Sequence, residues 1–228
     1  MNATPAAAQP ASLAANRVVR ALAARGGRRA VLPFVTAGYP SLESTERLLP
    51  RLSQAGAAVI EVGIPFSDPI ADGPVIAESM HEALVAGCTP AKVFAAIKRV
   101  RPQVQAALVA MVSVSIVDRM GPAAFAQQAA EAGFDGLIVP DIDMGDAPAL
   151  RAACDAAGLT CTFLVSPTSS PERAAHIARL CTGFVYALAR LGITGERTEA
   201  PDVKPVVDRI RAATALPVAA GFGISTVT

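Results

Sequence analysis

The chain has 228 residues, of which 52% are hydrophobic and 17% are charged, and its formal net charge is +1. This composition is too apolar for a disordered chain and supplies one sizeable hydrophobic core. The near-zero net charge gives no electrostatic reason to expect nucleic acid or a membrane surface as a partner. No uncharged apolar run reaches the roughly 20 residues that a membrane span needs.

The amino-terminal region predicts a tail followed by a basic helix. It has no basic segment ahead of an apolar stretch, which excludes a secretory signal peptide. Five arginines precede the first acidic residue, Glu43, a pattern that organelle transit peptides share. A short tail and a basic amphipathic helix explain the same residues more simply. Because no linker-like stretch follows residue 30, we expect a disordered tail over residues 1–15 and one domain over residues 16–228.

Short apolar runs then alternate with longer stretches rich in Ala, Leu and Arg. The predicted strands cover residues 31–36, 58–63, 106–112, 136–139, 160–165, 184–188 and 217–220. The predicted helices cover residues 43–55, 75–86, 90–101, 120–132, 146–157, 171–181 and 202–213. Ser41 or Ser44, Thr89 and Ser170 are suitable N-caps for three of these helices. Nearly continuous apolar runs are typical of parallel strands that are buried on both faces.

Repeated β/α units leave two architectures open, an open doubly wound sheet and a (β/α)8 barrel. The first strand is not followed by a GxGxxG motif, which disfavours the dinucleotide-binding version of the open sheet. The spacing of the strands favours an α/β fold of the TIM-barrel type. The sequence ends at Thr228, directly after the seventh predicted strand. We therefore expect a barrel that is incomplete at its carboxyl end or receives its eighth unit from elsewhere.

The few cysteines and histidines predict no metal site. The cysteines show no CxxC spacing and are Cys88, Cys154, Cys161 and Cys181. Reduced, mostly buried thiols in a cytoplasmic protein are the expectation for this pattern. Both histidines, His81 and His176, fall on predicted helices, so no Ser/His/Asp or Cys/His catalytic group can be assembled.

The first candidate catalytic groups lie in residues 61–74, which comprise the end of the second predicted strand and the loop that follows it. Glu61 lies within an otherwise apolar strand. If its side chain points into the barrel, desolvation raises its pKa, and the carboxyl can then both donate and accept a proton near neutrality. The alternative is a strand-end residue that faces solvent or forms a salt bridge. Asp72 follows in a loop rich in Gly and Pro, where turn chemistry alone could explain it.

Two later loops lie at the same end of the predicted barrel, where active sites of this fold occur. Residues 189–200 contain two glycines and no periodicity, as expected of a mobile lid. Gly221 and Gly223 precede Ser225 at a predicted helix start. Glycines and a helix amino terminus at this corner can bind a phosphate, although a simple tight turn has the same pattern.

Together these residues resemble the tryptophan synthase alpha chain family. The segment EVGIPFSDPIADGP at residues 61–74 is similar to the signature segment of that family. The same family is matched in the same order by PFVTAGYP at 33–40, GLIVPD at 136–141, FLVSPTS at 163–169, FVYALARLGITGER at 184–197 and GFGIS at 221–225. The resemblance begins with a leading helix at residues 16–30 and extends to residue 228.

The resemblance implies a (β/α)8 barrel that cleaves indole-3-glycerol phosphate to indole and glyceraldehyde 3-phosphate in tryptophan biosynthesis. Indole would pass to a beta chain in an α2β2 heterotetramer. Pyridoxal phosphate would belong to that beta chain, and this chain would carry no cofactor. The enzyme would be cytoplasmic, with neither nucleic acid nor membrane as a partner.

The resemblance also implies roles for individual residues. Glu61 would protonate the indole ring carbon that loses its side chain, and Asp72 would accept the ring N–H and stabilise the cationic intermediate. Tyr186 would be the active-site tyrosine. The implied substrate-binding residues, which contact the ring, close the lid or bind the phosphate, are Phe34, Ile76, Thr194, Gly195, Gly221, Phe222 and Gly223. The family's Gly-Ser pair after the eighth strand would lie beyond Thr228.

Three departures from the family pattern concern the rim of the barrel: residues 111–115, Ile142-Asp143 and Ala189. They leave Glu61 and Asp72 intact but differ where the family contacts the beta chain. One alternative function is a stand-alone lyase that keeps Glu61 and Asp72 but needs no beta chain. Another is a non-catalytic partner subunit of the beta chain, which a missing eighth unit would favour and the presence of both carboxylates disfavours. A Schiff-base aldolase is disfavoured because all three lysines fall on predicted helices.

Overall fold

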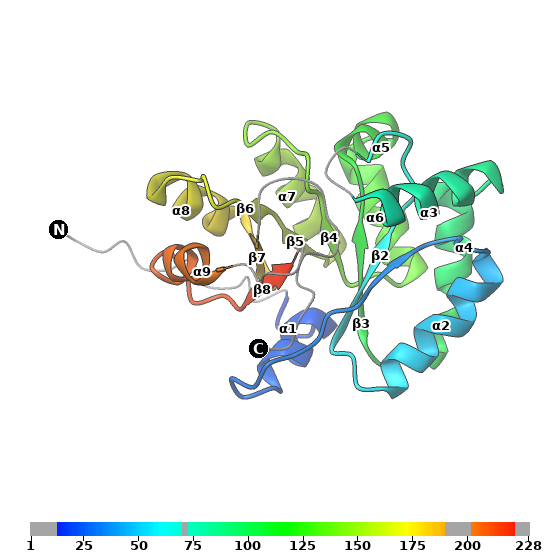
Figure 1. Cartoon of the computed structure of the whole chain (residues 1–228), viewed down its shortest axis with the longest axis horizontal. Coiled ribbons are helices and arrows are strands. Elements are labelled where there is room, and N and C mark those ends of the chain that lie inside the picture. Colours follow the sequence, from blue (N-terminus) through cyan, green and yellow to red (C-terminus); the bar gives the residue numbers. More distant parts are fainter. Residues whose placement is uncertain (1–12, 70–72, 190–201, 222–228) are drawn as a thin grey trace.

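The computed structural model describes residues 13–69, 73–189 and 202–221 (Figure 1). The strands are β1 (Phe34–Thr36), β2 (Val59–Gly63), β3 (Ala107–Met111), β4 (Gly136–Ile138), β5 (Thr160–Thr162), β6 (Leu164–Val165), β7 (Val185–Leu188) and β8 (Val218–Gly221). The helices are α1 (Arg17–Ala23), α2 (Leu42–Gln54), α3 (Pro74–Val85), α4 (Pro90–Val100), α5 (Val114–Met120), α6 (Pro122–Ala132), α7 (Ala147–Ala157), α8 (Pro171–Leu180) and α9 (Lys204–Arg211). The predicted alternation of strands and helices is therefore confirmed in this part of the chain. The predicted tail over residues 1–15 lies mostly outside it.

All strand pairs are parallel, in the orders β1-β2-β3-β4-β5 and β6-β7-β8. The predicted strand at 160–165 was wrong as a single element, because the chain changes partners at Phe163. Residues before Phe163 pair with β4 and those after it pair with β7. The amide of Phe163 itself donates to the Cys181 thiol, at 3.2 Å, in place of a strand carbonyl. This short segment therefore links the two sheets into one curved wall.

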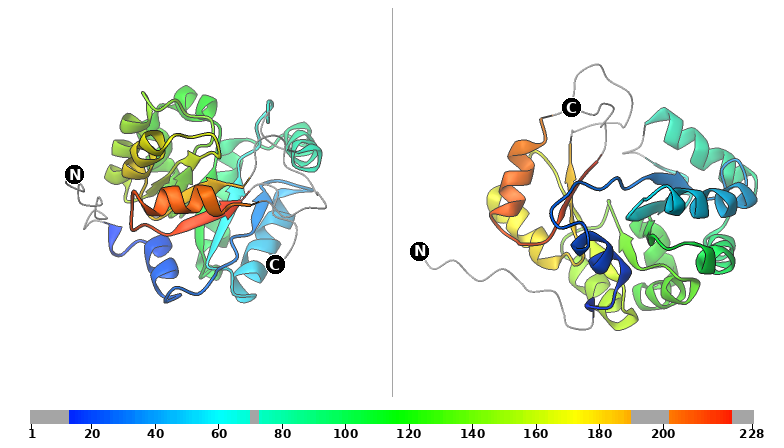
Figure 2. Two further views of the ribbon diagram at one scale, coloured as in Figure 1. Left: turned by 60° about the vertical axis from the view of Figure 1, so that its left-hand side comes forward. Right: turned by 90° about the horizontal axis from the view of Figure 1, so that it is seen from below.

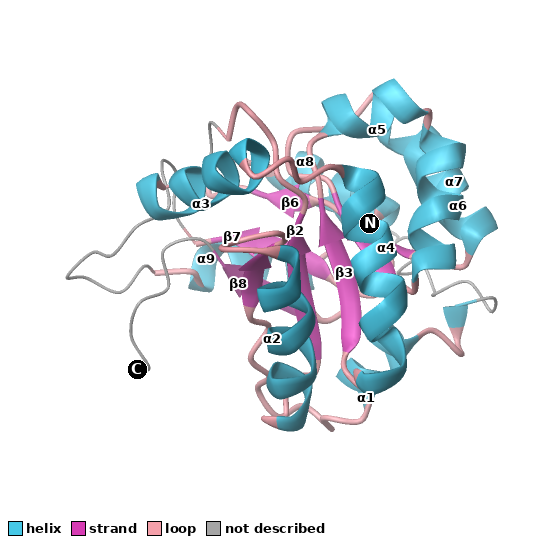
Figure 3. Ribbon diagram, turned by 90° about the vertical axis from the view of Figure 1, so that its right-hand side faces the viewer, coloured by secondary structure: helices cyan, strands magenta, loops and turns pink. Residues whose placement is uncertain are grey.

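Strands β2 to β5 and most of β7 are buried on both faces, as their apolar sequences predict, whereas β1, β6 and β8 are only partly buried. Their outer face packs against the surrounding helices, and Figure 3 shows α2 and α4 lying over β2 and β3. Their inner face forms a separate cluster that includes Val59, Val109, Ile138 and Phe184. Val18 of α1 belongs to this inner cluster and is fully buried. Seen from below in Figure 2, α1 lies across the amino-terminal end of the strands.

A buried carboxylate, Asp135, fastens α1 at this end of the strands. It accepts bonds from Arg17 at 3.1 Å, from Arg101 at 3.3 Å and from the amide of Leu108 at 2.9 Å. Asn16 adds two bonds, to the carbonyls of Asp135 and Gly158. The amino-terminal end of the strands is therefore held by ion pairs and hydrogen bonds as well as by apolar packing.

The helix boundaries test the capping predictions. Ser41, Thr89 and Ser170 are N-caps, and each side-chain oxygen accepts an amide hydrogen bond from the first turn of its helix. Helix α5 was not predicted, because its residues continue the apolar run of β3. Its amino terminus is bonded by Asp141, which accepts from the amide of Val114 at 2.8 Å and from the hydroxyl of Ser113 at 2.6 Å.

The four cysteines are buried, free thiols. Burial raises the pKa of Cys88 and Cys161, and it raises the pKa of Cys181 to about 12. Cys154 on α7 interacts with Cys161 on β5, and Cys181 lies beside them. In the described ranges, no group of three His, Cys, Asp or Glu side chains is arranged to hold a metal ion. Within the same ranges, no helix combines the length and apolar character that a bilayer crossing demands.

Candidate active site

Glu61 lies in the middle of β2 and faces the interior of the barrel. The residue is only 3% exposed, and its neighbours Ile60 and Val62 point outward into the helix-covered core. Phe34 on β1 and Val109 on β3 are its register partners. The sequence left two orientations of the Glu61 side chain open, and the structure has the inward one.

The interior changes the proton affinity of this carboxyl. Desolvation by burial raises the pKa of Glu61 to about 8, and a hydrogen bond from the Tyr186 hydroxyl opposes the rise by favouring the ionised form. Glu61 is therefore mainly protonated at neutral pH and close to the point at which it can also act as a base. This is the property that a residue with both acid and base roles requires.

Tyr186 reaches Glu61 from the other sheet. It lies on β7, is 5% exposed, and pairs in register with Leu164 and Ala219. Gly221 on β8 leaves the space that its ring occupies, because a Cβ at position 221 would lie 2.6 Å from the ring carbon Cζ. The hydrogen bond between Glu61 and Tyr186 therefore spans the interior from one sheet to the other.

Two predicted substrate contacts lie beside this pair. Phe34 on β1 packs against the inner cluster next to Glu61. Gly63 gives the Phe34 ring its room, since a Cβ there would approach the ring to 2.8 Å at Cε2. Ile76 lies in the first turn of α3 and is half-buried. The structure thus brings Glu61, Tyr186 and Phe34 together in the barrel interior and places Ile76 on α3, the helix that follows β2.

The remaining predicted site residues lie outside the described residues. They are Asp72, Thr194, Gly195, Phe222 and Gly223. Their roles stay predictions that rest on the resemblance.

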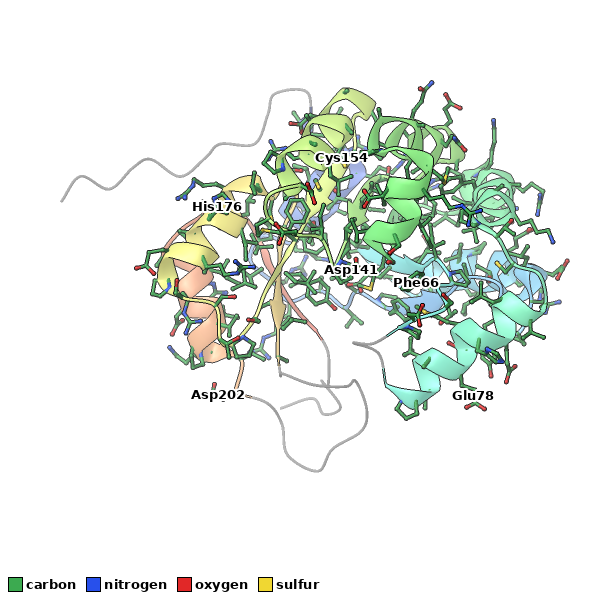
Figure 4. All side chains as sticks on the ribbon, turned by 90° about the horizontal axis from the view of Figure 1, so that it is seen from above. Phe66, Glu78, Asp141, Cys154, His176 and Asp202 are labelled. Carbon is green, nitrogen blue, oxygen red and sulfur yellow. The ribbon has the colours of Figure 1, made fainter. Side chains whose placement is uncertain are left out.

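Two polar pairs near the carboxyl ends of the strands were not predicted. Thr36, the last residue of β1, bonds Ser79 of α3 with 2.7 Å between the hydroxyl oxygens. Asp141, after β4, accepts the hydroxyl of Ser113 as described above. Figure 4 shows Asp141 near the middle of the molecule, whereas His176 lies at the periphery of the molecule. The available signal was a polar residue at the end of a strand or shortly after it, but the sequence did not show which residue would be its partner.

The comparisons with known proteins decide the family. The family model described as tryptophan synthase alpha chain matches residues 21–228. The chain belongs to the tryptophan synthase alpha chain family. Its relatives include the tryptophan synthase alpha chain of Gloeobacter violaceus, 42% identical over 213 residues, with 92% of this chain and 77% of that protein covered. The alpha chain of Geotalea uraniireducens is 42% identical over 89% of this chain and 76% of its own length.

Solved structures of the same family have the same fold. Tryptophan synthase from Mycobacterium tuberculosis aligns with a TM-score of 0.85 at 34% identity, over 93% of this chain and 82% of that chain. A mutant tryptophan synthase alpha subunit from Pyrococcus furiosus aligns with a TM-score of 0.80 at 33% identity, covering 86% and 79%. The predicted TIM-barrel class is confirmed.

Family membership also confirms the broader functional expectations. The chain has the alpha-subunit role in tryptophan biosynthesis. Alpha chains of tryptophan synthase carry no cofactor, and pyridoxal phosphate belongs to the beta chain, which is their partner.

Proposed function

We propose that this chain cleaves indole-3-glycerol phosphate to indole and glyceraldehyde 3-phosphate, in the cytoplasm, as the alpha subunit of an α2β2 tryptophan synthase. The observation that carries the proposal is the carboxyl of Glu61, buried in the barrel interior with its pKa raised to about 8. Such a group is protonated at neutral pH and becomes a base once it has given its proton away.

The reaction needs one proton delivered and one removed. Glu61 donates its proton to the ring carbon that carries the glycerol chain, which turns the ring into a cationic intermediate. The carboxylate that remains then accepts the proton of the adjacent chain hydroxyl as the carbon–carbon bond breaks and the aldehyde forms. The ring recovers the bonding electrons and leaves as indole, so the proton balance closes on Glu61.

Tyr186 and Asp72 support the charges that develop. The Tyr186 hydroxyl bonds the Glu61 carboxylate and so stabilises the ionised form that exists between the two proton transfers. From the resemblance, Asp72 accepts the ring N–H and offsets the positive charge of the intermediate. Phe34 and Ile76 supply apolar contacts for the ring, and the glycines at 195 and 223 bind the phosphate.

The test measures indole release from indole-3-glycerol phosphate, with and without an added beta chain. It uses this chain, its Glu61→Gln variant and a surface control, Glu46→Gln. The same assay is run on a version extended at residue 228 by the corresponding segment of the Gloeobacter violaceus relative, because this chain covers 77% of that protein.

The expected result is indole release that Glu61→Gln lowers by about 10²- to 10⁴-fold while Glu46→Gln leaves it unchanged. Release that does not respond to the beta chain would favour a stand-alone lyase. Folded protein that binds the beta chain but releases no indole in either version would overturn the proposal in favour of a non-catalytic partner subunit.

A further inference from the structure

Helix α3, which follows the segment that contains the predicted catalytic residue Asp72, makes few apolar contacts with the barrel. Helix α3 has three buried residues, Ser79, Met80 and Ala83, whereas the neighbouring α4 buries five apolar ones. Val75 and Val85, near its two ends, are both 75% exposed. Its N-cap, Gly73, has no side chain with which to cap the first turn. The position of α3 on the barrel therefore depends more on polar contacts than the position of α4 does.

A chain of two hydroxyl groups links α3 to β1. The hydroxyl oxygens of Thr36 and Ser79 are 2.7 Å apart, and Ser79 donates to the carbonyl of Ile76, also at 2.7 Å. A carbonyl can only accept, so the single hydroxyl proton of Ser79 is committed to Ile76. Thr36 must then be the donor in the bond with Ser79. Both residues are buried, at 9% and 6% exposure, which makes the loss of either bond costly.

This chain of bonds starts and ends at predicted site positions. Thr36 lies two residues after Phe34, on the same face of β1, and pairs in register with Gly63, two residues after Glu61. The acceptor at the other end is the backbone of Ile76, the expected ring contact in the first turn of α3. The hydroxyl pair thus fixes the first turn of α3 relative to the strands that hold Glu61 and Phe34.

We propose that Ser79 is a positioning residue for substrate binding: through Thr36 it sets the place of Ile76 and of the first turn of α3. The inference rests on the proposed function, because Ile76 matters only if the indole ring binds against it. Ser79 itself touches neither the ring nor the reacting atoms. Its loss should therefore weaken substrate binding more than it slows the chemical step.

The experiment compares Ser79→Ala, Thr36→Val, the double variant and the conservative Thr36→Ser, in the complex with the beta chain. Expected is a rise in KM for indole-3-glycerol phosphate of roughly five- to tenfold in each single hydroxyl-removing variant, with kcat lowered less than threefold. The double variant should be no worse than either single one, because both break the same chain. Thr36→Ser, which keeps the hydroxyl, should restore the KM to near the wild-type value.

Thr182→Val is the matched control, since Thr182 is 2% exposed and its hydroxyl accepts the amide of Cys161, at 2.7 Å, ahead of β7. It should lower the melting temperature without changing the KM. A second readout is independent of turnover: affinity for an indole that carries a propyl phosphate chain and so lacks the cleavable hydroxyl, measured by calorimetry. Ser79→Ala should weaken this binding by the same factor as the KM.

An unchanged KM and unchanged analogue affinity in folded Ser79→Ala, with an active wild type, would overturn the role of Ser79 alone. Additive effects in the double variant would also overturn it, because Thr36 and Ser79 would then act separately. A wild-type complex that neither cleaves the substrate nor binds the analogue would instead overturn the proposed function, and this inference with it.

Discussion

Two carboxyl groups, Glu61 and Asp135, are buried in the part of the chain that the structure describes, and their surroundings differ. Asp135, at the amino-terminal end, is 6% exposed and accepts bonds from Arg17, Arg101 and a backbone amide. Glu61, in the interior, is 3% exposed, and its pKa is dominated by desolvation with one opposing hydrogen bond, from Tyr186. The same chemical group is surrounded by cations in one place and by apolar side chains in the other.

The difference shows that the fold uses one buried carboxyl, Asp135, for stability and the other, Glu61, for proton transfer. A carboxylate that is paired with guanidinium groups keeps a fixed charge and holds α1 against the strands. A buried carboxyl without a cationic partner has a raised pKa and keeps its proton at neutral pH. Its burial lowers the free energy of unfolding, but the proton is then available for the reaction. The two sites should therefore respond in opposite ways when each carboxyl is replaced.

The largest expected effect is on catalysis, from Glu61→Gln. The amide cannot transfer a proton, so indole release should fall by about 10²- to 10⁴-fold. The free energy of unfolding at pH 7 should not decrease, because the amide removes a group whose ionisation opposes burial. Urea denaturation alongside the activity assay checks both parts, and a large loss of stability would contradict the comparison.

The reciprocal change is Asp135→Asn, which leaves Arg101 buried without a carboxylate. We expect a loss of about 3 to 5 kcal/mol in the free energy of unfolding, with kcat per folded molecule unchanged. Asp208→Asn is the control, since it removes an exposed ion pair with Lys204 on α9 and should cost less than about 0.5 kcal/mol. A loss of activity in folded Asp135→Asn would show that the two ends are coupled.

The pH dependence of stability sharpens the comparison further. Glu61 has a pKa near 8 in the folded chain against an ordinary value of 4.5, so the folded state binds the proton more tightly. Below pH 4.5 both states are protonated, and between pH 4.5 and 8 the unfolded state alone ionises. The wild type should therefore lose stability to this group as pH rises through that window, by about 1.4 kcal/mol per pH unit.

Glu61→Gln lacks this titration, so its stability relative to the wild type should increase between pH 5.5 and 7.5. Chemical denaturation of both proteins at several pH values measures the difference. Parallel curves across the window would mean that Glu61 does not hold its proton in the folded state.

The smallest expected effect concerns Tyr186→Phe. Removing the hydroxyl takes away the bond that favours ionised Glu61, so the pKa of Glu61 should rise further. The alkaline limb of the kcat/KM profile should move to higher pH, by roughly half a unit to one unit. Tyr39→Phe, at the other tyrosine, is 42% exposed and should leave the profile in place. A shift to lower pH would contradict the hydrogen-bond assignment.

Local patterns were enough to predict most strands and helices, and they offered the inward orientation of Glu61 as one of two alternatives. The apolar run around Glu61 implied burial on both faces, and burial implied a raised pKa. N-caps such as Ser41 could be predicted because the donor and acceptor are only three residues apart. These features depend on neighbours in sequence or on the period of a strand.

The features that escaped prediction depend on partners far along the chain. Helix α5 begins where Asp141, 27 residues later, accepts the amide of Val114. The hydroxyls of Thr36 and Ser79 are 43 residues apart in sequence. The switch of strand partners at Phe163 depends on the Cys181 thiol, 18 residues away. No local pattern of residues encodes such pairs, because they form only when distant parts of the chain come together in the fold.

The buried thiols have a consequence for following how the barrel opens. Three of them lie together, with Cys154 on α7, Cys161 on β5 and Cys181 at the end of α8, while Cys88 lies between α3 and α4. Thiol reagents attack the thiolate, so burial shields all four cysteines until the surrounding packing separates, and the raised pKa of Cys88, Cys161 and Cys181 adds to this protection. The rate at which each cysteine is labelled in native buffer therefore measures how often the structure around that cysteine opens. Equal rates would mean that the barrel opens as one cooperative unit, and faster labelling of Cys88 would mean that the α3 side opens first.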